Sequence, residues 1–345
     1  MEGSKFTKLM IYKHSNDIRE AANVTEACIK PPNNGEILVR NYFVGVNAMD
    51  MNVMTGRSKL FADKLPFDFG MESLGVIESI GIDIDPKQYP IGQAGLILAR
   101  RPKTYAQYVY VQPMEFYPIP DVNRHYLGLL DCGLTASIGL DMAGKINSGE
   151  VVLITAAAGG TGHIAVQWAK SKGCKVIGLC STESKCEFLR SIGCDRVINY
   201  KVDDLDRILD DEYPDGLDVI WETIGGDTFE RLFNHLAIGG RIVIVGAISG
   251  YKTVGFPQIS IDHLPTKLMG KSASIVGFRF RHYERLFTQY LTELIDLYRN
   301  NRLMVRLDTK TINGKDLVGI SSIIDAIEHQ QSGLNLGKVI VSLQQ

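Results

Sequence analysis

The residues best suited to chemistry lie in a glycine-rich stretch that follows a short apolar run. The run covers residues 151–155, and Ala157, Gly159 and Gly162 follow at the spacing of the pattern G-x-G-x-x-G, with alanine in its first position. Apolar residues resume at a helical spacing after Gly162. A strand, tight turn and helix of this kind offer backbone N–H groups and a partial positive charge to a phosphate. This pattern predicts a pyrophosphate site formed by Gly159, Gly160, Thr161 and Gly162. A tight turn without a ligand is the alternative.

A second apolar run, residues 175–180, lies at the distance expected for the second strand of a βαβ unit. Sites specific for NAD place an Asp or Glu about 20 residues beyond the glycines, where it binds the ribose 2′-OH. Here hydroxyls and a lysine follow the run, and these groups suit a dianionic 2′-phosphate. Glu183 fits the first turn of the next helix, where its carboxylate offsets the helix dipole. The residues predicted to bind the 2′-phosphate of NADPH are Ser181, Lys185 and Tyr200.

Composition and charge exclude several classes of function. The chain has 345 residues, 45% of them hydrophobic and 22% charged, which fits an α/β protein of two domains. A net charge of −2 gives no electrostatic reason to expect a nucleic acid partner. No apolar run approaches the roughly 20 residues of a membrane span. The N-terminus shows no signal peptide and the C-terminus no Ser-Lys-Leu sequence, so we expect a cytoplasmic protein.

The cysteine content also indicates a cytoplasmic protein. No two of the six cysteines form a C-x-x-C pair, so we expect reduced and mostly buried side chains. They are Cys28, Cys132, Cys174, Cys180, Cys186 and Cys194.

The order of predicted elements indicates one domain inserted into another. The first 120 residues are rich in short strands, predicted at 8–12, 36–46, 75–80 and 105–111. From Tyr126 onward strands and helices alternate, with strands predicted at 151–155, 175–180, 196–199, 217–222, 241–246 and 273–278, enough for a doubly wound sheet. A helix over 282–299 precedes a terminal strand near residue 340, which should pair with the β-rich domain. We therefore predict a discontinuous β-rich domain, 1–122 and 282–345, around a nucleotide-binding domain, 123–281.

The motif order resembles that of the medium-chain dehydrogenase/reductase superfamily over nearly the whole chain. The motifs are Val44–Asp50, Pro66–Gly75, Ala156–Gly162, Asp218–Glu222, Gly246–Tyr251 and Gly337–Val339. The resemblance implies a Rossmann doubly wound parallel sheet inserted into a GroES-like catalytic domain. Finer motifs, among them Ile248–Tyr251 and Leu264–Leu268, are most similar to the zinc-independent quinone oxidoreductase-like branch and, within it, to the prostaglandin reductases. That resemblance implies NADPH-dependent reduction of the enone double bond of 15-oxo-prostaglandins.

The zinc ligands of the superfamily's alcohol dehydrogenases are not matched here. Those enzymes hold catalytic zinc through Cys, His and Cys. The corresponding positions carry Asn47, the Met71-Glu72 pair and Cys132, so only the third position has a suitable ligand. We therefore expect no metal, a structural hydrogen bond for Glu72 and a buried, inert Cys132.

The resemblance also implies which residues form the active site. Tyr251 is the first candidate to stabilise the enolate oxygen, with a purely cofactor-packing role as the alternative. Asn47 is expected at the nicotinamide ribose and shares the catalytic assignment, with a local turn role as its alternative. Further cofactor-binding residues are Thr135, Val245, Gly246, Phe278, Arg279, Phe280 and Asn335. His163 is expected to be a solvated residue without a chemical role.

Substrate and assembly are less constrained by the sequence. Met49, Met54, Phe61, Phe67 and Tyr283 could line an apolar cleft, or be core or surface residues. A quinone oxidoreductase and a catalytically silent NADPH-binding relative are the alternatives to an enone reductase. The resemblance further implies a homodimer joined through the sixth strand, about 273–278.

Overall fold

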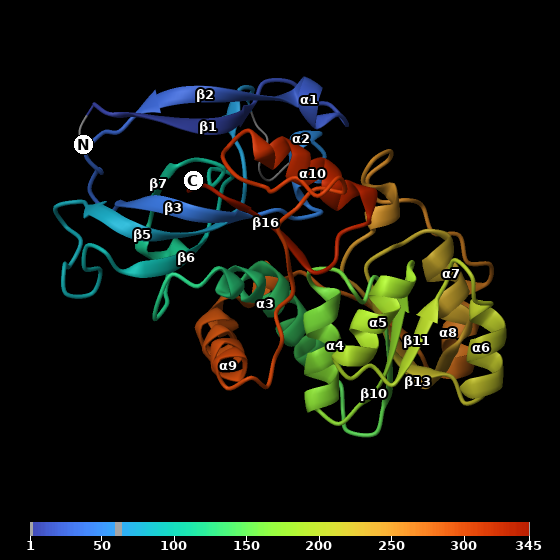
Figure 1. Cartoon of the computed structure of the whole chain (residues 1–345). Coiled ribbons are helices and arrows are strands. Elements are labelled where there is room, and N and C mark those ends of the chain that lie inside the picture. The colour runs from blue at the N-terminus through green and yellow to red at the C-terminus, as the bar shows by residue number, and fades with distance from the viewer. Residues whose placement is uncertain (1–2, 59–63, 345) are drawn as a thin grey trace. The chain divides into compact units, whose positions relative to one another are not determined.

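The computed structural model describes residues 3–58 and 64–344 and divides into two compact units (Figure 1). Unit 1 comprises Met1–Asp131 and Leu307–Gln345, and unit 2 comprises Cys132–Arg306. The predicted domain limits were 122/123 and 281/282, so the units differ from them mainly at the C-terminal limit. The helix α9 (Phe287–Arg299) belongs to unit 2. Its Tyr290 hydroxyl donates to Asp141 at 3.0 Å, and its ring lies 5.9 Å from that of Trp168.

Unit 2 is built on one six-stranded parallel sheet. Its strands are β9 (Val151–Ile154), β10 (Lys175–Cys180), β11 (Arg196–Asn199), β12 (Leu217–Glu222), β13 (Leu236–Ile244) and β14 (Ser274–Gly277). The order across the sheet is β11-β10-β9-β12-β13-β14. Numbered from β9, this is the 3-2-1-4-5-6 order of the doubly wound fold, so the prediction of that sheet is confirmed.

The helices of unit 2 follow the strands in alternation. They are α4 (Gly162–Ser171), α5 (Glu183–Ser191), α6 (Leu205–Glu212), α7 (Asp227–Asn234) and α8 (Leu264–Lys271), with α9 after the last strand. Thr182 caps α5 by accepting the Lys185 N–H at 3.4 Å, and Glu183 lies in the first turn as predicted. Apolar strand and helix residues, such as Leu153 and Phe229, are buried together in the core. Because all six strands are parallel, the residues that follow them collect at one edge of the sheet, the carboxyl edge.

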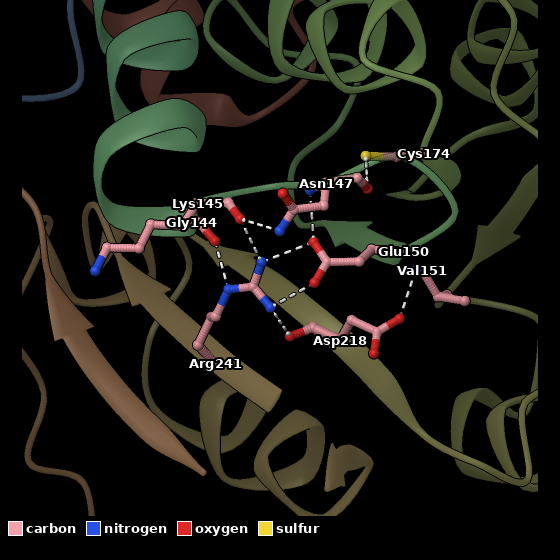
Figure 2. A network of polar contacts seen from close by, with 8 residues as sticks. All are labelled: Gly144, Lys145, Asn147, Glu150, Val151, Cys174, Asp218 and Arg241. Carbon is pink, nitrogen blue, oxygen red and sulfur yellow. Dashed lines mark hydrogen bonds and ion pairs between the residues drawn. The ribbon is translucent and has the colours of Figure 1, made fainter. Parts of the chain in front are cut away.

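Arg241 closes the opposite, amino edge of the same sheet (Figure 2). Its guanidinium donates to the Gly144 carbonyl and, at 2.8 Å, to the Lys145 carbonyl. It also donates to both carboxylate oxygens of Glu150, at 2.9 and 2.7 Å. Glu150 in turn accepts the Asn147 N–H at 2.7 Å. The π-helical turn Gly139–Gly144 ends at these carbonyls, so one side chain saturates its end and ties it to the start of β9.

Unit 1 contains two sheets. The smaller is antiparallel and has the order β2 (Ala22–Cys28), β1 (Lys5–Ile11), β4 (Phe67–Asp68). The larger contains β3 (Ile37–Gly45), β5 (Glu72–Ile80), β6 (Ala94–Leu98), β7 (Tyr108–Val111), β8 (Phe116–Pro118), β15 (Leu307–Asp308) and β16 (Lys338–Ser342), and is antiparallel except for the parallel pair of β15 and β16. β16 pairs with β3, with Ile340 opposite Gly45, which confirms that the terminal strand joins the β-rich part of the chain. The helices of unit 1 are α1 (Ile18–Ala21), α2 (Asp50–Met54) and α10 (Ser322–Ser332). The helix α3 (Asp131–Ile138) starts at the last residue of the first segment of unit 1 and otherwise belongs to unit 2.

In the described parts of the chain, no helix is both long enough and apolar enough to cross a membrane.

Candidate functional site

The glycine turn after β9 admits no side chain at Gly162. A Cβ there would lie 2.3 Å from the Ala156 carbonyl oxygen and 2.7 Å from the Ala157 Cα, both of them backbone atoms. This close approach explains why a glycine is required where the helix packs on the strand. Within the described residues, we find no acceptor for the N–H groups of Gly160, Thr161 and Gly162. The turn therefore presents donors at the start of α4, as a pyrophosphate requires.

His163 is not a solvated residue, so that prediction was wrong. Its side chain is completely buried, with Nδ1 2.8 Å from the Gly159 carbonyl and Nε2 accepting the Arg306 N–H at 3.1 Å. A carbonyl on one nitrogen and an N–H on the other require the neutral tautomer with its hydrogen on Nδ1. Burial lowers the pKa of His163 to about 4, against the raising effect of its backbone contacts. The partner at Arg306 is 143 residues away, which is why the local pattern did not reveal it.

Gln167, one turn further along α4, holds the same distant segment. Its amide donates to the Met304 carbonyl at 2.9 Å and accepts the Met304 N–H at 2.8 Å. Together with His163 it fixes residues 304–306 to the helix that starts at the glycine turn. Sequence analysis did not find these contacts either, since a single glutamine within a helical pattern gives no sign of a distant partner.

The residues predicted for the 2′-phosphate follow two neighbouring strands. Ser181 directly follows β10, Lys185 lies in the first turn of α5, and Tyr200 directly follows β11. The Tyr200 N–H donates to the Cys180 carbonyl at 3.2 Å. The Lys185 side chain is largely buried, while Tyr200 is half-exposed. The fold thus places these three residues at the same corner of the carboxyl edge.

Tyr251 is buried beside the end of β13. Its hydroxyl accepts the Ala247 N–H at 3.2 Å, and a Cβ on Gly246 would lie 3.1 Å from that oxygen. Burial raises the pKa of Tyr251. Val245 and Gly246 come directly after β13, and the Val245 N–H donates to the Glu222 carbonyl at 2.8 Å. The hydroxyl is therefore oriented by its own loop at the carboxyl edge.

Glu222 is a group at this edge to which the sequence analysis gave no role. It ends β12, is completely buried, and accepts the N–H groups of Ile224 and Gly225 at 2.7 and 2.9 Å. Burial raises its pKa to about 7, although these two hydrogen bonds lower it. A lone carboxylate that ends an apolar run before Gly225-Gly226 was the available signal. It shapes the loop that Ile248 and Ser249 contact.

The other predicted cofactor residues of unit 2 are placed as follows. Phe278 directly follows β14, is buried, and has its ring 5.5 Å from that of Tyr283. Arg279 is exposed, and Phe280 stacks on Phe287 at 5.3 Å. Thr135 is buried within α3. Phe278, Arg279 and Phe280 follow β14 and therefore lie at the carboxyl edge.

Asn47 lies in unit 1, in a buried polar cluster with Glu72 and Lys338. Its amide donates to Glu72 at 2.8 Å and its carbonyl oxygen accepts the Lys338 ammonium at 2.6 Å. Lys338 also forms an ion pair with Glu72, and both of these side chains are almost completely buried. Glu72 accepts a further N–H from Asp131 at 3.3 Å, so its predicted structural role is confirmed. Both ends of the Asn47 side chain are thus engaged.

A second chain of polar contacts begins at the Asn47 backbone. Asp50 accepts the Asn47 N–H at 2.9 Å and the Tyr105 hydroxyl at 2.5 Å. Burial raises the pKa of Asp50 to about 7, although both hydrogen bonds lower it. Its other oxygen is buried and has no hydrogen-bond partner among the residues that the structure describes. The loop that carries Asn47 is therefore held rigidly from two sides.

These residues do not fit a zinc ion. Zinc sites take three or four Cys, His or carboxylate ligands, and in the described chain no group of three or more such side chains is arranged to hold a metal. The Lys338 ammonium already neutralises Glu72 and contacts Asn47, so a second cation would meet a like charge. Cys132 is buried, as predicted.

Asn335 and the predicted cleft residues have varied environments. The Asn335 amide donates to the Gly337 carbonyl at 3.0 Å. Met54 is core and Met49 exposed, Phe67 lies in β4, and Tyr283 packs on Phe278. Phe61 lies outside the described residues.

Comparison with known proteins decides the family. The profile of the alcohol dehydrogenase GroES-like domain matches residues 33–121, and that of the zinc-binding dehydrogenases matches residues 160–298. Over 340 residues the chain is 39% identical to prostaglandin reductase-3 of Mus musculus, covering 97% of this chain and 89% of the relative. The chain belongs to the medium-chain dehydrogenase/reductase superfamily. The predicted GroES-like domain and the resemblance to prostaglandin reductase 3 are thereby confirmed.

Other members of this oxidoreductase superfamily are similar along their full length. The chain is 37% identical to a probable quinone oxidoreductase of Leishmania amazonensis over 346 residues, or 99% of each protein. The crystal structure of Escherichia coli quinone oxidoreductase complexed with NADPH superimposes with a TM-score of 0.86 at 24% identity, covering 98% of this chain and 100% of that one. At that identity the structural likeness shows the medium-chain dehydrogenase/reductase fold.

Proposed function

We propose that this medium-chain dehydrogenase/reductase uses NADPH to reduce the carbon–carbon double bond of α,β-unsaturated ketones, with 15-oxo-prostaglandins as first candidate substrates. The observation that carries the proposal is the pairing of the glycine turn with the Ser181–Lys185 corner in a chain 39% identical to prostaglandin reductase-3. Relatives named (+)-pulegone reductase, at 27% identity, and 2-alkenal reductase (NADP(+)-dependent), at 30%, are named for α,β-unsaturated carbonyl substrates, which supports the substrate class.

The carboxyl edge of unit 2 fits the proposed cofactor. The N–H groups of the glycine turn would hold the pyrophosphate, and Ser181, Lys185 and Tyr200 would hold the 2′-phosphate. When bound, NADPH supplies the hydride that the electrophilic β-carbon of the enone accepts. The remaining proposed contacts are Asn47, Thr135, Val245, Gly246, Tyr251, Phe278, Arg279, Phe280 and Asn335.

The chain's own task is to orient the enone and stabilise the charge that develops on its oxygen. Because the residues at the zinc positions do not fit a metal, hydrogen-bond donors must perform that stabilisation. Tyr251 is our candidate, since its hydroxyl is oriented by Ala247 and stays protonated at neutral pH. Asn47 is our second candidate, and its two contacts fix the direction of its amide.

The runner-up is a quinone oxidoreductase, supported by the relative from Leishmania amazonensis. It would use the same cofactor residues and differ in the shape of the substrate cleft. A silent NADPH-binding relative would keep the cofactor residues and turn over neither substrate.

The test is NADPH oxidation in the presence of EDTA, with a 15-oxo-prostaglandin and a simple quinone assayed in parallel. We expect turnover of the prostaglandin enone, undiminished by the chelator. Turnover of the quinone alone would favour the runner-up. No turnover of either substrate, together with a melting temperature raised by NADPH, would favour a catalytically inactive NADPH-binding relative.

We also propose a homodimer joined through β14. This strand is the outermost strand on one side of the six-stranded sheet, so its outer backbone groups could pair with a second copy of the chain. A monomeric mass in solution would contradict the proposal.

A further inference from the structure

Two buried thiols face each other where β10 passes into α5. Cys180 is the last residue of β10 and Cys186 lies in the first half of α5. Their Sγ atoms are 2.8 Å apart, and both side chains are almost completely excluded from solvent. A disulfide requires about 2.05 Å between the sulfurs. Less than about 1 Å of movement therefore separates this pair from a covalent bond.

The other buried thiols of the sheet have different partners. Cys194 donates to the Arg196 carbonyl at 3.2 Å, and Cys174 donates to the Asn147 carbonyl at 3.4 Å. Both contacts are the ordinary structural use of a buried thiol as a weak donor. Cys180 and Cys186 differ because each has a thiol as its near neighbour.

The pair lies between the residues proposed to bind the 2′-phosphate. Cys180 directly precedes Ser181, and Cys186 directly follows Lys185. We propose that Cys180 and Cys186 form a reversible disulfide that weakens the binding of NADPH at this corner. The second half of this inference rests on the proposed function, whereas the first half does not.

The chemistry balances with a hydroperoxide as oxidant. One thiolate attacks the peroxide oxygen and becomes a sulfenic acid, releasing water or an alcohol. The second thiol then displaces water from the sulfenic sulfur, so two thiols lose two electrons and the peroxide is reduced. A small dithiol returns both side chains to thiols by exchange.

The surroundings of Cys180 control how fast this disulfide forms. Burial raises the pKa of the Cys180 thiol, and so does the neighbouring Cys186. Because the thiolate is the nucleophile, a raised pKa slows the attack of Cys180 on a peroxide. The Lys185 ammonium acts in the opposite direction on the same thiol. A charged 2′-phosphate bound to Lys185 would offset that effect, so bound NADPH should slow the oxidation.

Closing the bond would alter the binding corner. Cys186 is adjacent to Lys185, so drawing its sulfur toward Cys180 shifts the first turn of α5 relative to Ser181. Charge-assisted hydrogen bonds are sensitive to such shifts, and loss of one weakens binding by about tenfold. We expect that loss for NADPH and a smaller one for NADH, which has no 2′-phosphate.

The test exploits the position of Lys185. Trypsin cleaves after Lys175, Lys185 and Arg190, so Cys180 and Cys186 fall in different peptides, 176–185 and 186–190. The full-length protein is treated with hydrogen peroxide, digested without reductant and analysed by mass spectrometry. We expect the two peptides joined, with the loss of two hydrogen atoms, and separated again by a dithiol. Separate peptides at all peroxide concentrations would overturn the disulfide.

Affinity measurements then test the control of binding. The Kd for NADPH is measured for reduced, oxidised and re-reduced protein. Cys186→Ala should bind NADPH equally well before and after peroxide, whereas the matched Cys194→Ala should respond as the wild type does. A joined pair with an unchanged Kd would overturn the effect on NADPH. If reduced wild type does not bind NADPH, the proposed function fails, and the peptide map still decides the disulfide.

Discussion

The two edges of the parallel sheet in unit 2 use polar groups in opposite ways. At the amino edge, Arg241 and Glu150 satisfy one another and the carbonyls around them, so the network is closed (Figure 2). At the carboxyl edge, the glycine turn, Ser181 and Lys185 follow neighbouring strands, and we propose that they bind an anion. One edge is a closed structural network, and the other is the ligand site that we propose.

The difference teaches where each kind of residue can be found. The carboxyl edge is encoded locally, since its glycines lie within one short stretch directly after β9. The amino edge is encoded over distance, because Arg241 and Glu150 are 91 residues apart. Substitutions at the amino edge should therefore change stability and leave binding intact, with the reverse pattern at the carboxyl edge.

The largest effect is expected for Arg241→Met. This change removes the cation paired with Glu150 and one donor to each of the Gly144 and Lys145 carbonyls, in a setting where the Arg241 and Glu150 side chains are only 15% and 21% exposed. We expect a loss of about 2–4 kcal/mol in the free energy of unfolding, measured by urea denaturation. The Kd for NADPH should change by less than about twofold.

Arg196→Met is the control, since its ion pair with Glu212 is more exposed, at 33% and 40%. It should cost less than about 1 kcal/mol. If Arg241→Met weakened NADPH binding as strongly as it lowers stability, the separation of the two edges would be wrong.

The next effect concerns acid stability and His163. Its pKa is lowered from 6.5 to about 4 in the folded protein, so the unfolded chain takes up the proton first as pH falls. Stability from this residue is present above pH 6.5 and is lost between pH 6.5 and about 4. The full loss is about 3 kcal/mol.

His163→Gln cannot take up that proton. Its free energy of unfolding should therefore fall less steeply between pH 7 and 5 than that of the wild type, by about 2 kcal/mol. His282→Gln, at an exposed position, should leave the slope unchanged. Equal slopes for wild type and His163→Gln would contradict the buried neutral imidazole.

Lys185→Ala should act at the carboxyl edge alone. Loss of a charged donor to the 2′-phosphate should raise the Kd for NADPH by about 10- to 100-fold. The Kd for NADH should change by less than about threefold, because no charge is lost toward it. Lys172→Ala, which removes the ion pair with Asp141, is the matched control and should affect neither cofactor. Equal losses for both cofactors would remove Lys185 from the 2′-phosphate site.

The smallest effect is expected for Tyr251→Phe. If the hydroxyl acts in the transition state, kcat should fall by about tenfold while KM changes little. Because burial raises the pKa of Tyr251, its ionisation should produce no decline of kcat below pH 10. Tyr12→Phe, a half-exposed tyrosine of unit 1, should leave both constants unchanged. A rise in KM alone would indicate a role in binding.

The sequence was sufficient for unit 2 and less so for unit 1. Predominantly apolar runs such as 175–180 and 217–222 coincide with β10 and β12, because strands buried on both faces have that pattern. β2 was missed because its sequence, ANVTEAC, interrupts its small apolar residues with Asn, Thr and Glu, and most of its residues are exposed, as in an edge strand. β6 was missed because AGLIL is short and contains glycine.

The site divides in the same way. Gly162 and Glu183 were placed correctly because their roles depend on neighbours along the chain. His163, Gln167 and Lys338 were not, since each takes its role from a partner more than 130 residues away. Such partners are set by the tertiary fold, which no local pattern contains.

The position of Lys338 has a consequence for the order in which the chain is built. Its ammonium balances a carboxylate that is synthesised 266 residues earlier, and its strand fills a place beside β3. Unit 2 is one continuous segment, complete at Arg306, whereas unit 1 cannot close until β16 leaves the ribosome. During synthesis the first segment of unit 1, Met1–Asp131, therefore has Glu72 without the Lys338 counter-charge until the whole of unit 2 has been made.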